Sequence, residues 1–429
     1  MTVESAVIAA PRSRTRQLLA TSAGNLVEWY DWLAYAFLAT YFADQVFARS
    51  ENRLVPLLSA FAVFAVGFVM RPVGGLVIGA VSDRLGRRTA MTLTIGLMGV
   101  GQVLMAALPT YAQVGLLSPL LLVLIRLIQG LSVGGEFAVS SVFLVESASP
   151  RRRGLFSSFS YFSSNLGQLL AAGVTALLSS MLSSSEMTSW GWRLPFALGA
   201  VACLAGLWIR HGTDETYLQA KAIREGRVAR PGLFDFLRLH PRESLLVAGM
   251  TVGATVSFYT WSIYLPTYAE ITVGADPGTA LTASTVALAF FTAIQPLGGL
   301  LSDRIGRKPL LIVFGGGFTV LTVPLLALLQ NSFWNLLLIM CVAMVLLTGY
   351  TAVCSAVMVE LFPARVRTTG IGFPYAVTVA AFGGTAPYIA TALADNGHGS
   401  LFGWYATALT LVSTIVYIRM RETRGTPLG

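Results

Sequence analysis

Charged residues are scarce in this chain of 429 residues: they make up 11 % of the sequence, whereas 55 % of the residues are apolar. In an ordinary soluble domain, roughly a quarter of the residues are charged. A soluble protein of this length would need many more polar side chains to cover its surface. The composition therefore excludes a water-soluble enzyme and predicts that lipid is the solvent for most of the surface.

Residues for disulfide bonds, metal sites and nucleotide binding are scarce as well. The three cysteines lie within apolar runs, as small core residues do, and are too few for a disulfide scaffold. His211, His240 and His398 have no partner at metal-ligand spacing, so no metal site is expected. The sequence contains no phosphate-binding P-loop, which argues against an ATP-driven pump. We expect no cofactor.

Long apolar runs, by contrast, recur along the whole chain. A helix that crosses roughly 30 Å of hydrocarbon needs about 20 predominantly apolar residues. Such helices satisfy their own backbone hydrogen bonds in lipid, whereas barrel strands would alternate in polarity over about ten residues. The sequence therefore predicts an all-α polytopic membrane protein with twelve transmembrane helices. They are expected at Leu18–Phe42, Leu54–Ser82, Thr89–Pro109, Pro119–Glu146, Gly154–Leu182, Trp190–Ile209, Ser244–Ile271, Gly278–Ser302, Leu310–Leu329, Phe333–Leu361, Thr368–Leu393 and Leu401–Ile418.

The basic residues are distributed unevenly between the expected loops. With both termini placed in the cytoplasm, most of the 29 lysines and arginines fall on the cytoplasmic side, and Arg49, Arg53 and Arg193 fall on the outer side. The net charge of +9 is then explained by orientation and by contact with anionic lipid, and nucleic-acid binding is not expected. The first apolar run is longer than a signal-peptide core, so it should remain as a helix. We expect a bacterial-type inner or plasma membrane.

One charged motif occurs twice. Residues 79–88 read GAVSDRLGRR and residues 299–308 read GLLSDRIGRK, and each copy ends an expected helix at the cytoplasmic side. A second pair, residues 146–151 and 360–365, repeats with nearly the same separation. The sequence therefore predicts two six-helix bundles, at residues 1–210 and 242–429, joined by a cytoplasmic linker at residues 211–241.

The repeated motifs predict a charged latch at the cytoplasmic ends of the helices. The first glycine permits close helix contact, the aspartate can pair with arginine, and the second glycine allows a tight turn. Basic loops could also merely follow the positive-inside rule, but the repeated spacing favours a latch. The predicted latch residues are Gly79, Asp83, Arg84, Gly86, Arg87, Glu146, Arg151, Asp303, Arg304, Gly306, Arg307, Glu360 and Arg365, with the neighbouring Arg152, Arg153 and Arg367 in the same clusters.

With these motifs the chain resembles the major facilitator superfamily, whose signature Gly-x-x-x-Asp-Arg-x-Gly-Arg-Arg/Lys matches both copies. Within it, the chain is similar to the metabolite:proton symporter family, which includes permeases for α-ketoglutarate, citrate, shikimate and proline/betaine; the α-ketoglutarate permeases are the most similar members. The segments that carry this resemblance are residues 24–32, 70–75, 126–136, 190–199 and 382–385. The resemblance implies two bundles that rock around a central site by alternating access, driven by the proton gradient.

Five charged residues lie at mid-membrane depth, away from the ends of the expected helices: Glu28, Asp31, Arg71, Arg126 and Glu136. Charges at this depth are costly, so they are functional candidates by default. A desolvated carboxylate takes up a proton more readily, and a bound anion strengthens this effect, which couples the two binding events. We expect Arg71, with Arg126, to bind a substrate carboxylate, and Glu28, Asp31 or Glu136 to take the coupling proton. Alternatively, Glu136 pairs with Arg71 or Arg126 only to hold helices together.

Polar and aromatic residues in other helices could line the same cavity, although each could equally join helices. The full set of predicted substrate-binding residues is Asn25, Tyr35, Arg71, Arg126, Gln129, Gln168, Tyr259, Tyr264 and Tyr375.

The predicted function is import of a small organic acid, such as α-ketoglutarate or a related di- or tricarboxylate, together with protons. The alternatives are a symporter of proline, betaine or a shikimate-like metabolite, a drug/proton antiporter, or a membrane sensor. The antiporter is disfavoured because the expected fifth helix contains no proline, and the sensor because the linker is too short for a folded output domain. The expected partners are the substrate, protons and the bilayer, and we expect a monomer.

Overall fold

The computed structural model describes residues 14–48, 54–211, 232–396 and 398–428. Within these ranges the chain is helical and contains no strand, as the composition predicts. The helices that precede residue 212 are called the first half here, and those that follow residue 231 the second half. Most of the expected linker, residues 212–231, lies outside the described residues.

Six long helices make up the first half. They are α1 (Arg14–Val46), α2 (Leu54–Leu85), α3 (Arg87–Ala106), α5 (Leu117–Ser147), α6 (Arg153–Met181) and α8 (Arg193–His211). The short helices α4 (Tyr111–Val114) and α7 (Ser184–Glu186) and a π-helical turn (Met187–Gly191) connect them.

The second half repeats this plan with more interruptions. It contains α10 (Asp235–Leu239), α11 (Pro241–Phe258), α12 (Leu265–Val273), α13 (Pro277–Ile305), α14 (Lys308–Ala327), α15 (Phe333–Thr351), α16 (Cys354–Leu361), α17 (Arg367–Phe382), α18 (Ala386–Asp395) and α19 (Ser400–Arg419). A π-helical turn, Tyr259–Tyr264, joins α11 to α12, and a 3₁₀ turn, Ala364–Val366, precedes α17.

Nine helices in the described ranges are long and apolar enough to cross a membrane. The other three expected segments coincide with α1, with α6, and with α17 together with α18. Three segments expected to be continuous contain local changes: residues 259–264 form the π turn, residues 352–353 separate α15 from α16, and residues 383–385 separate α17 from α18. Long apolar runs predict the spans, but hydropathy cannot reveal such breaks, because the sequence stays largely apolar across them.

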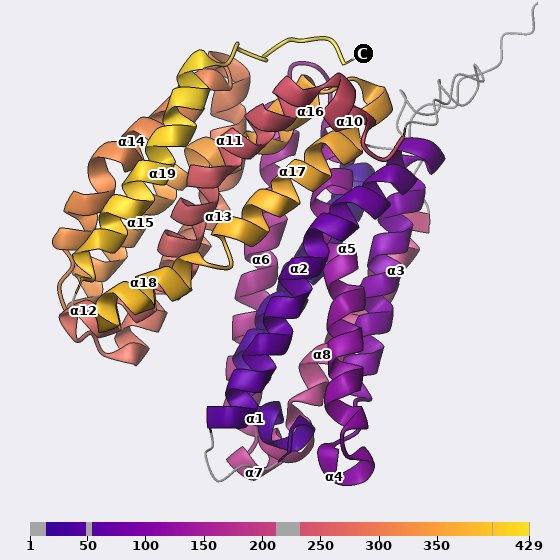
Figure 1. Cartoon of the computed structure of the whole chain (residues 1–429), viewed down its shortest axis with the longest axis vertical. Helices are drawn as coiled ribbons and strands as arrows, with labels where there is room; N and C mark the ends of the chain where they lie inside the picture. Colours follow the sequence, from indigo (N-terminus) through magenta and orange to yellow (C-terminus); the bar gives the residue numbers. More distant parts are fainter. Residues whose placement is uncertain (1–13, 49–53, 212–231, 397, 429) are drawn as a thin grey trace, which may run out of the picture.

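The two halves lie close together at one end of the molecule and diverge toward the other (Figure 1). At the close end, α2 packs against α17 and α6 packs against α13. A methyl group at Gly75 would lie 2.6 Å from the carbonyl oxygen of Gly372, and one at Gly299 would lie 2.5 Å from that of Gly154. Glycine is therefore required where these helices cross, because any larger residue would separate their backbones.

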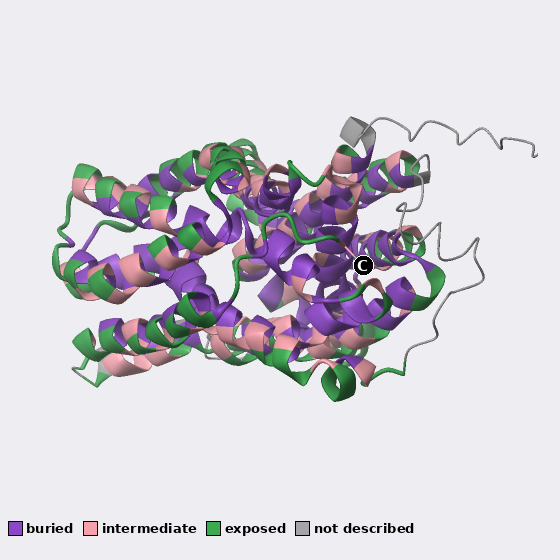
Figure 2. Cartoon of the chain, turned by 90° about the horizontal axis from the view of Figure 1, so that it is seen from above, coloured by how far each residue is buried: buried purple, intermediate pink, exposed green. Residues whose placement is uncertain are grey.

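The outer faces of the helices are apolar. Figure 2 shows buried residues concentrated in the interior and exposed residues on the outward helix faces. The exposed residues include large apolar side chains such as Trp208, Leu245 and Leu338. An apolar exterior of this extent is unfavourable in water and is typical of contact with lipid.

Candidate functional site

Two adjoining pockets lie where the halves face each other, and together they are called the central pocket. Both are small and only partly enclosed. The first half contributes Glu28, Trp29, Arg71, Val133, Gly134, Phe137, Tyr161 and Ser164, and the second half contributes Ala254, Thr255, Phe258, Tyr259, Tyr350, Tyr375, Ala376 and Val379. Aromatic and aliphatic walls with a few polar groups are typical of small-molecule sites.

Arg71 is the cation of this pocket. Its guanidinium carbon lies 4.5 Å from the ring centre of Trp32 and 4.3 Å from that of Phe68, so two cation–π contacts hold it. Within the described ranges, no carboxylate forms an ion pair with Arg71, and its buried Nε has no hydrogen-bond partner. An almost fully buried guanidinium without a counter-ion is suited to bind an anion.

Glu28 lines the same pocket from α1. It is 6 % exposed, and none of the ion pairs between described residues includes it. Its carboxylate interacts electrostatically with Arg71, Glu136 and Asp31. The pocket therefore contains one cation and one carboxylate that are close enough to influence each other but are not paired.

Asp31 and Arg126 form a separate buried ion pair. Nη1 of Arg126 lies 3.1 Å from a carboxylate oxygen of Asp31, and Nε2 of Gln129 donates to the other oxygen at 2.9 Å. The guanidinium of Arg126 also stacks on Tyr35, 3.7 Å from the ring centre. None of these four residues lines the central pocket. Asn25 is outside it too and accepts a hydrogen bond from Ser140.

Glu136 pairs with an arginine that directly follows the last apolar run of the first bundle and that was not among the predicted site residues. The partner is Arg210, in the last turn of α8, and its Nη2 lies 2.6 Å from Oε1 of Glu136. The alternative partners considered from the sequence, Arg71 and Arg126, do not form this pair. Arg210 also donates to the carbonyl oxygens of Ala20 and Met91, so one guanidinium joins α1, α3, α5 and α8. A basic residue directly after an apolar run resembles a loop residue in sequence, which is why its burial was missed.

The remaining predicted site residues divide between the pocket and the helix interfaces. Tyr259 and Tyr375 line the pocket, and the ring of Tyr375 stacks on Phe137 at 3.9 Å. Gln168 instead contacts Asn165, and Tyr264 packs against Phe402. The aromatic wall formed by Trp29, Tyr161 and Phe258 was not predicted, because aromatic residues in apolar helices carry no sequence signal for the face they occupy.

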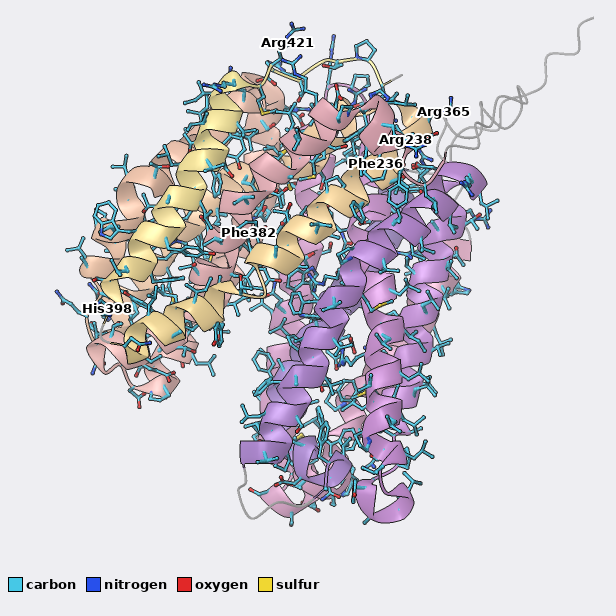
Figure 3. All side chains as sticks on the ribbon, in the orientation of Figure 1. Phe236, Arg238, Arg365, Phe382, His398 and Arg421 are labelled. Carbon is cyan, nitrogen blue, oxygen red and sulfur yellow. The ribbon has the colours of Figure 1, made fainter. Side chains whose placement is uncertain are left out.

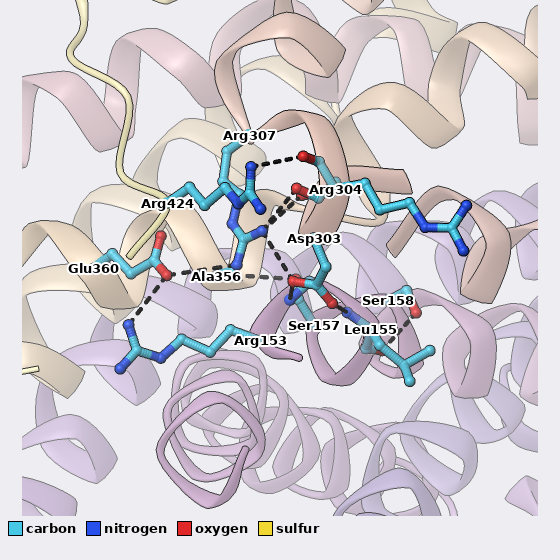
Figure 4. A network of polar contacts seen from close by, with 12 residues as sticks. Arg153, Leu155, Ser157, Ser158, Asp303, Arg304, Arg307, Ala356, Glu360 and Arg424 are labelled. Carbon is cyan, nitrogen blue, oxygen red and sulfur yellow. Dashed lines mark hydrogen bonds and ion pairs between the residues drawn. The ribbon is translucent and has the colours of Figure 1, made fainter. Parts of the chain in front are cut away.

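Two charged clusters join the halves at the close end of the molecule. In the first latch, Glu146 of α5 is bonded to Arg367 of α17 at 2.7 Å and to Arg87 of α3 at 3.5 Å. In the second latch, Glu360 of α16 lies 3.4 Å from Arg153 of α6 and 3.7 Å from Arg307 (Figure 4). Each latch thus combines one acid with an arginine from its own half and an arginine from the other half.

The repeated aspartates cap helices of the opposite half. Asp83 accepts hydrogen bonds from the backbone N–H groups of Thr368 and Thr369, at the start of α17. Asp303 accepts them from Gly154 and Leu155, at the start of α6. A carboxylate at a helix N-terminus satisfies free N–H groups and interacts favourably with the helix dipole. These caps exist only while the two halves touch.

The repeated glycines have the two roles that the motif indicates. Gly86 and Gly306 both have φ 105°, a conformation that favours glycine, and each ends its helix in a tight turn. Gly79 lies against Thr369, where a methyl group would come within 3.0 Å of the Thr369 Cα.

Four of the predicted latch arginines do not join the buried clusters. Arg84 and Arg304 are exposed at the ends of α2 and α13. Arg151 is exposed. Arg365 lies on the protein surface next to α10, where its Nη2 is 3.8 Å from Oδ2 of Asp235 (Figure 3). The buried positions belong to Arg153 and Arg367, because α6 and α17 begin at these residues and direct them inward.

Comparison with known proteins agrees with this architecture. Residues 17–235 match the family model "Sugar (and other) transporter", and residues 250–428 match the model "Major Facilitator Superfamily". The alpha-ketoglutarate permease of Escherichia coli (strain K12) is 39 % identical over 415 residues, which cover 96 % of this chain and 94 % of the permease. The chain belongs to the major facilitator superfamily.

Other transporters match over similar lengths. The citrate-proton symporter of Klebsiella pneumoniae is 33 % identical over 89 % of this chain and 86 % of its own. The proline/betaine transporter of Escherichia coli (strain K12) is 30 % identical over 96 % of this chain and 84 % of its own. The structure of the proton:xylose symporter XylE bound to 6-bromo-6-deoxy-D-glucose superimposes with a TM-score of 0.79 at 19 % identity, covering 97 % of both chains. The protein is therefore a multi-pass membrane transporter and not an enzyme.

Proposed function

We propose that this transporter imports a small organic acid, α-ketoglutarate or a related di- or tricarboxylate, together with protons. The observation that carries the proposal is Arg71, a buried guanidinium without a counter-ion in the described part of the chain, in a pocket between the halves. The similarity to an alpha-ketoglutarate permease and to a citrate-proton symporter supports an anionic substrate.

Transport in this proposal proceeds by alternating access of the central pocket. We place both termini and the two latches on the cytoplasmic side of the inner or plasma membrane. Residues 1–210 and 242–429 then act as two units that rock against each other, with residues 211–241 as their connection. The arrangement with both latches formed is the state closed to the cytoplasm, and it converts to the inward-open state when the latches separate.

Glu28 is the strongest candidate for the coupling proton. It lines the pocket, interacts with Arg71 and has no ion-pair partner among the described residues. An anion bound at Arg71 neutralises the cation that favours the charged form of Glu28, so substrate binding promotes proton uptake. Asp31 and Glu136 are the other candidates, but each already pairs with an arginine.

A zwitterionic substrate such as proline or betaine is the second candidate. A cation and a carboxylate that have no ion-pair partner in the described part of the chain would also suit a ligand with both charges, since the aromatic rings of the pocket attract ammonium groups. The similarity to a proline/betaine transporter supports this alternative.

The test is uptake of labelled α-ketoglutarate into proteoliposomes under an imposed inward proton gradient. Citrate, succinate, shikimate and proline serve as competitors. Uptake that depends on the gradient and is abolished by a protonophore is the expected result. Uptake that requires sodium, or competition from proline alone, would contradict the proposed ion or substrate and leave the transporter class intact.

A further inference from the structure

Two hydrogen-bond donors, one from each half, meet in the central pocket. Arg71 belongs to α2, and Tyr259 begins the π-helical turn that follows α11. Their side chains interact with each other, and the ring of Phe68 contacts both: it lies 4.3 Å from the guanidinium carbon and 6.5 Å from the Tyr259 ring centre. Both residues line the same pocket.

Each side chain keeps one donor group without an acceptor among the described residues. The Nε of Arg71 and the hydroxyl of Tyr259 are buried without a hydrogen-bond partner in the described part of the chain. A buried donor left unpaired costs about 1–3 kcal/mol, so such groups usually have a partner in the functional state. Two adjacent donors without an acceptor fit a ligand that supplies one, and a carboxylate has enough lone pairs to accept from both.

The other tyrosines of the pocket are placed differently. Tyr161 and Tyr375 interact with each other, and the hydroxyl of Tyr350 lies 3.5 Å from that of Thr251. Among the described pocket tyrosines, Tyr259 is the one whose buried hydroxyl has no hydrogen-bond partner, and it lies beside the cation.

Tyr259 also lies where regular α-helix is interrupted in the second half. A methyl group at Gly383 would lie 2.7 Å from the Tyr259 ring, so this ring packs directly on the break between α17 and α18. Single π-helical turns occur often at functional sites. A ligand that holds Tyr259 would therefore act on the π turn and on the break at the same time.

We propose that one substrate carboxylate bridges the guanidinium of Arg71 and the hydroxyl of Tyr259. Tyr259 is then a specificity-determining residue that selects for an anionic acceptor, and substrate binding draws the two halves together at the pocket. This inference rests on the proposed function, because it assigns the substrate of the same site to the carboxylates.

The test measures ligand affinity of the full chain in detergent by calorimetry, for wild type, Tyr259→Phe, Arg71→Lys and the double variant. The probes are α-ketoglutarate, citrate, proline and betaine, all of which carry a carboxylate. Tyr259→Phe should weaken binding about tenfold or more, because a hydrogen bond to a charged group is lost. If both residues hold the same carboxylate, the double variant should lose less affinity than the product of the two single losses predicts. Tyr268→Phe, at a buried tyrosine outside the pocket, is the matched control and should bind like wild type.

The outcomes separate this inference from the proposed function. Wild-type affinity in Tyr259→Phe, or independent effects of the two substitutions, would overturn the bridge and leave the organic-acid proposal intact. Binding of proline or betaine alone would overturn the organic-acid proposal, and the same variants tested with that ligand would then decide the bridge. Binding of none of the four probes would overturn both. An unchanged melting temperature in Tyr259→Phe, whose ring keeps its contact with Gly383, excludes misfolding as the cause of lost binding.

Discussion

The carboxylate of Glu146, on the first half, lies 2.7 Å from the guanidinium of Arg367, on the second. The second latch repeats the relationship with the halves exchanged, since Glu360 lies 3.4 Å from Arg153. The four side chains are almost completely buried. The duplicated sequence motif thus forms a two-fold arrangement in which each half supplies one acid to one latch and one arginine to the other.

Neutralising the latch acids should open the close end of the molecule. Removing one partner of a buried ion pair costs about 3–5 kcal/mol, which corresponds to a shift of 100-fold or more between two states. In a variant with Glu146→Gln and Glu360→Gln, spin labels at Leu85 and Ile305, both exposed at helix ends, should move apart. Double electron–electron resonance on a cysteine-free background measures this distance.

The control for the latch is Arg365→Gln, because the Arg365 side chain is 54 % exposed and, within the described part of the chain, its only ion pair is with Asp235. Its distance distribution should match that of wild type. A double variant with unchanged label distances would show that the latches do not determine the closed state.

Enlarging Gly75 should impair transport through backbone contact alone. A methyl group at Gly75 would lie 2.6 Å from the carbonyl oxygen of Gly372, so α2 and α17 cannot close fully. Gly96→Ala is the matched control, because a methyl group there meets no atom within 4 Å. We expect Gly75→Ala to reduce the initial rate of substrate uptake at least tenfold, and Gly96→Ala to keep the wild-type rate. Equal rates in the two variants would mean that the close approach of these helices is not needed.

Arg210 should be essential for the stability of the first half. Arg210→Gln leaves the carboxylate of Glu136 buried without its partner, which costs about 3–5 kcal/mol. The thermal melting temperature in detergent should fall by several degrees, and Glu136→Gln should show a similar loss. The double variant should be more stable than the sum of the single losses, because no unpaired charge remains. A Glu136→Gln variant of wild-type stability that has lost only gradient-driven uptake would instead identify Glu136 as the proton carrier.

Acid should release the segment at residues 420–428 from the second latch. Glu422 is partly buried, which opposes ionisation, but hydrogen bonds from the backbone N–H groups of Arg307, Arg424 and Lys308 outweigh this effect and lower its pKa below the ordinary value. Because the pKa of Glu422 is lower in the folded chain, its ionised form stabilises the contact at any pH above the ordinary pKa of a glutamate. That stability is lost as the pH falls through the lower, folded-state pKa. Hydrogen exchange of residues 420–428 should therefore be faster in Glu422→Gln at neutral pH. Unchanged exchange would show that Glu422 does not hold this segment.

The sequence predicted most of the helices and named Arg71 and Glu28 as candidate site residues, and their roles stay predictions. Long apolar runs identify the spans, and Arg71 and Glu28 stand out because charges are rare within such runs. The partner of Glu136 was not predictable, because Arg210 follows its apolar run and becomes buried only through packing of α8 against α1 and α3. The choice of Arg153 over Arg151 depends on the residue at which α6 begins, and sequence patterns locate helix boundaries only to within a few residues.

Glu28 and Asp31 should respond differently to neutralisation, although they lie one turn apart on α1. Glu28 lines the pocket without an ion-pair partner among the described residues, so Glu28→Gln should fold normally. Without a proton carrier, this variant should lose uptake driven by a proton gradient and keep exchange of labelled for unlabelled substrate. Asp31→Asn leaves Arg126 buried without its counter-ion, so both activities and the melting temperature should fall.

Proteoliposome uptake and counterflow, measured with and without the gradient, separate the two effects. Full gradient-driven uptake by Glu28→Gln would exclude Glu28 as the carrier, and loss of gradient-driven uptake by a stable Asp31→Asn variant would transfer that role to Asp31.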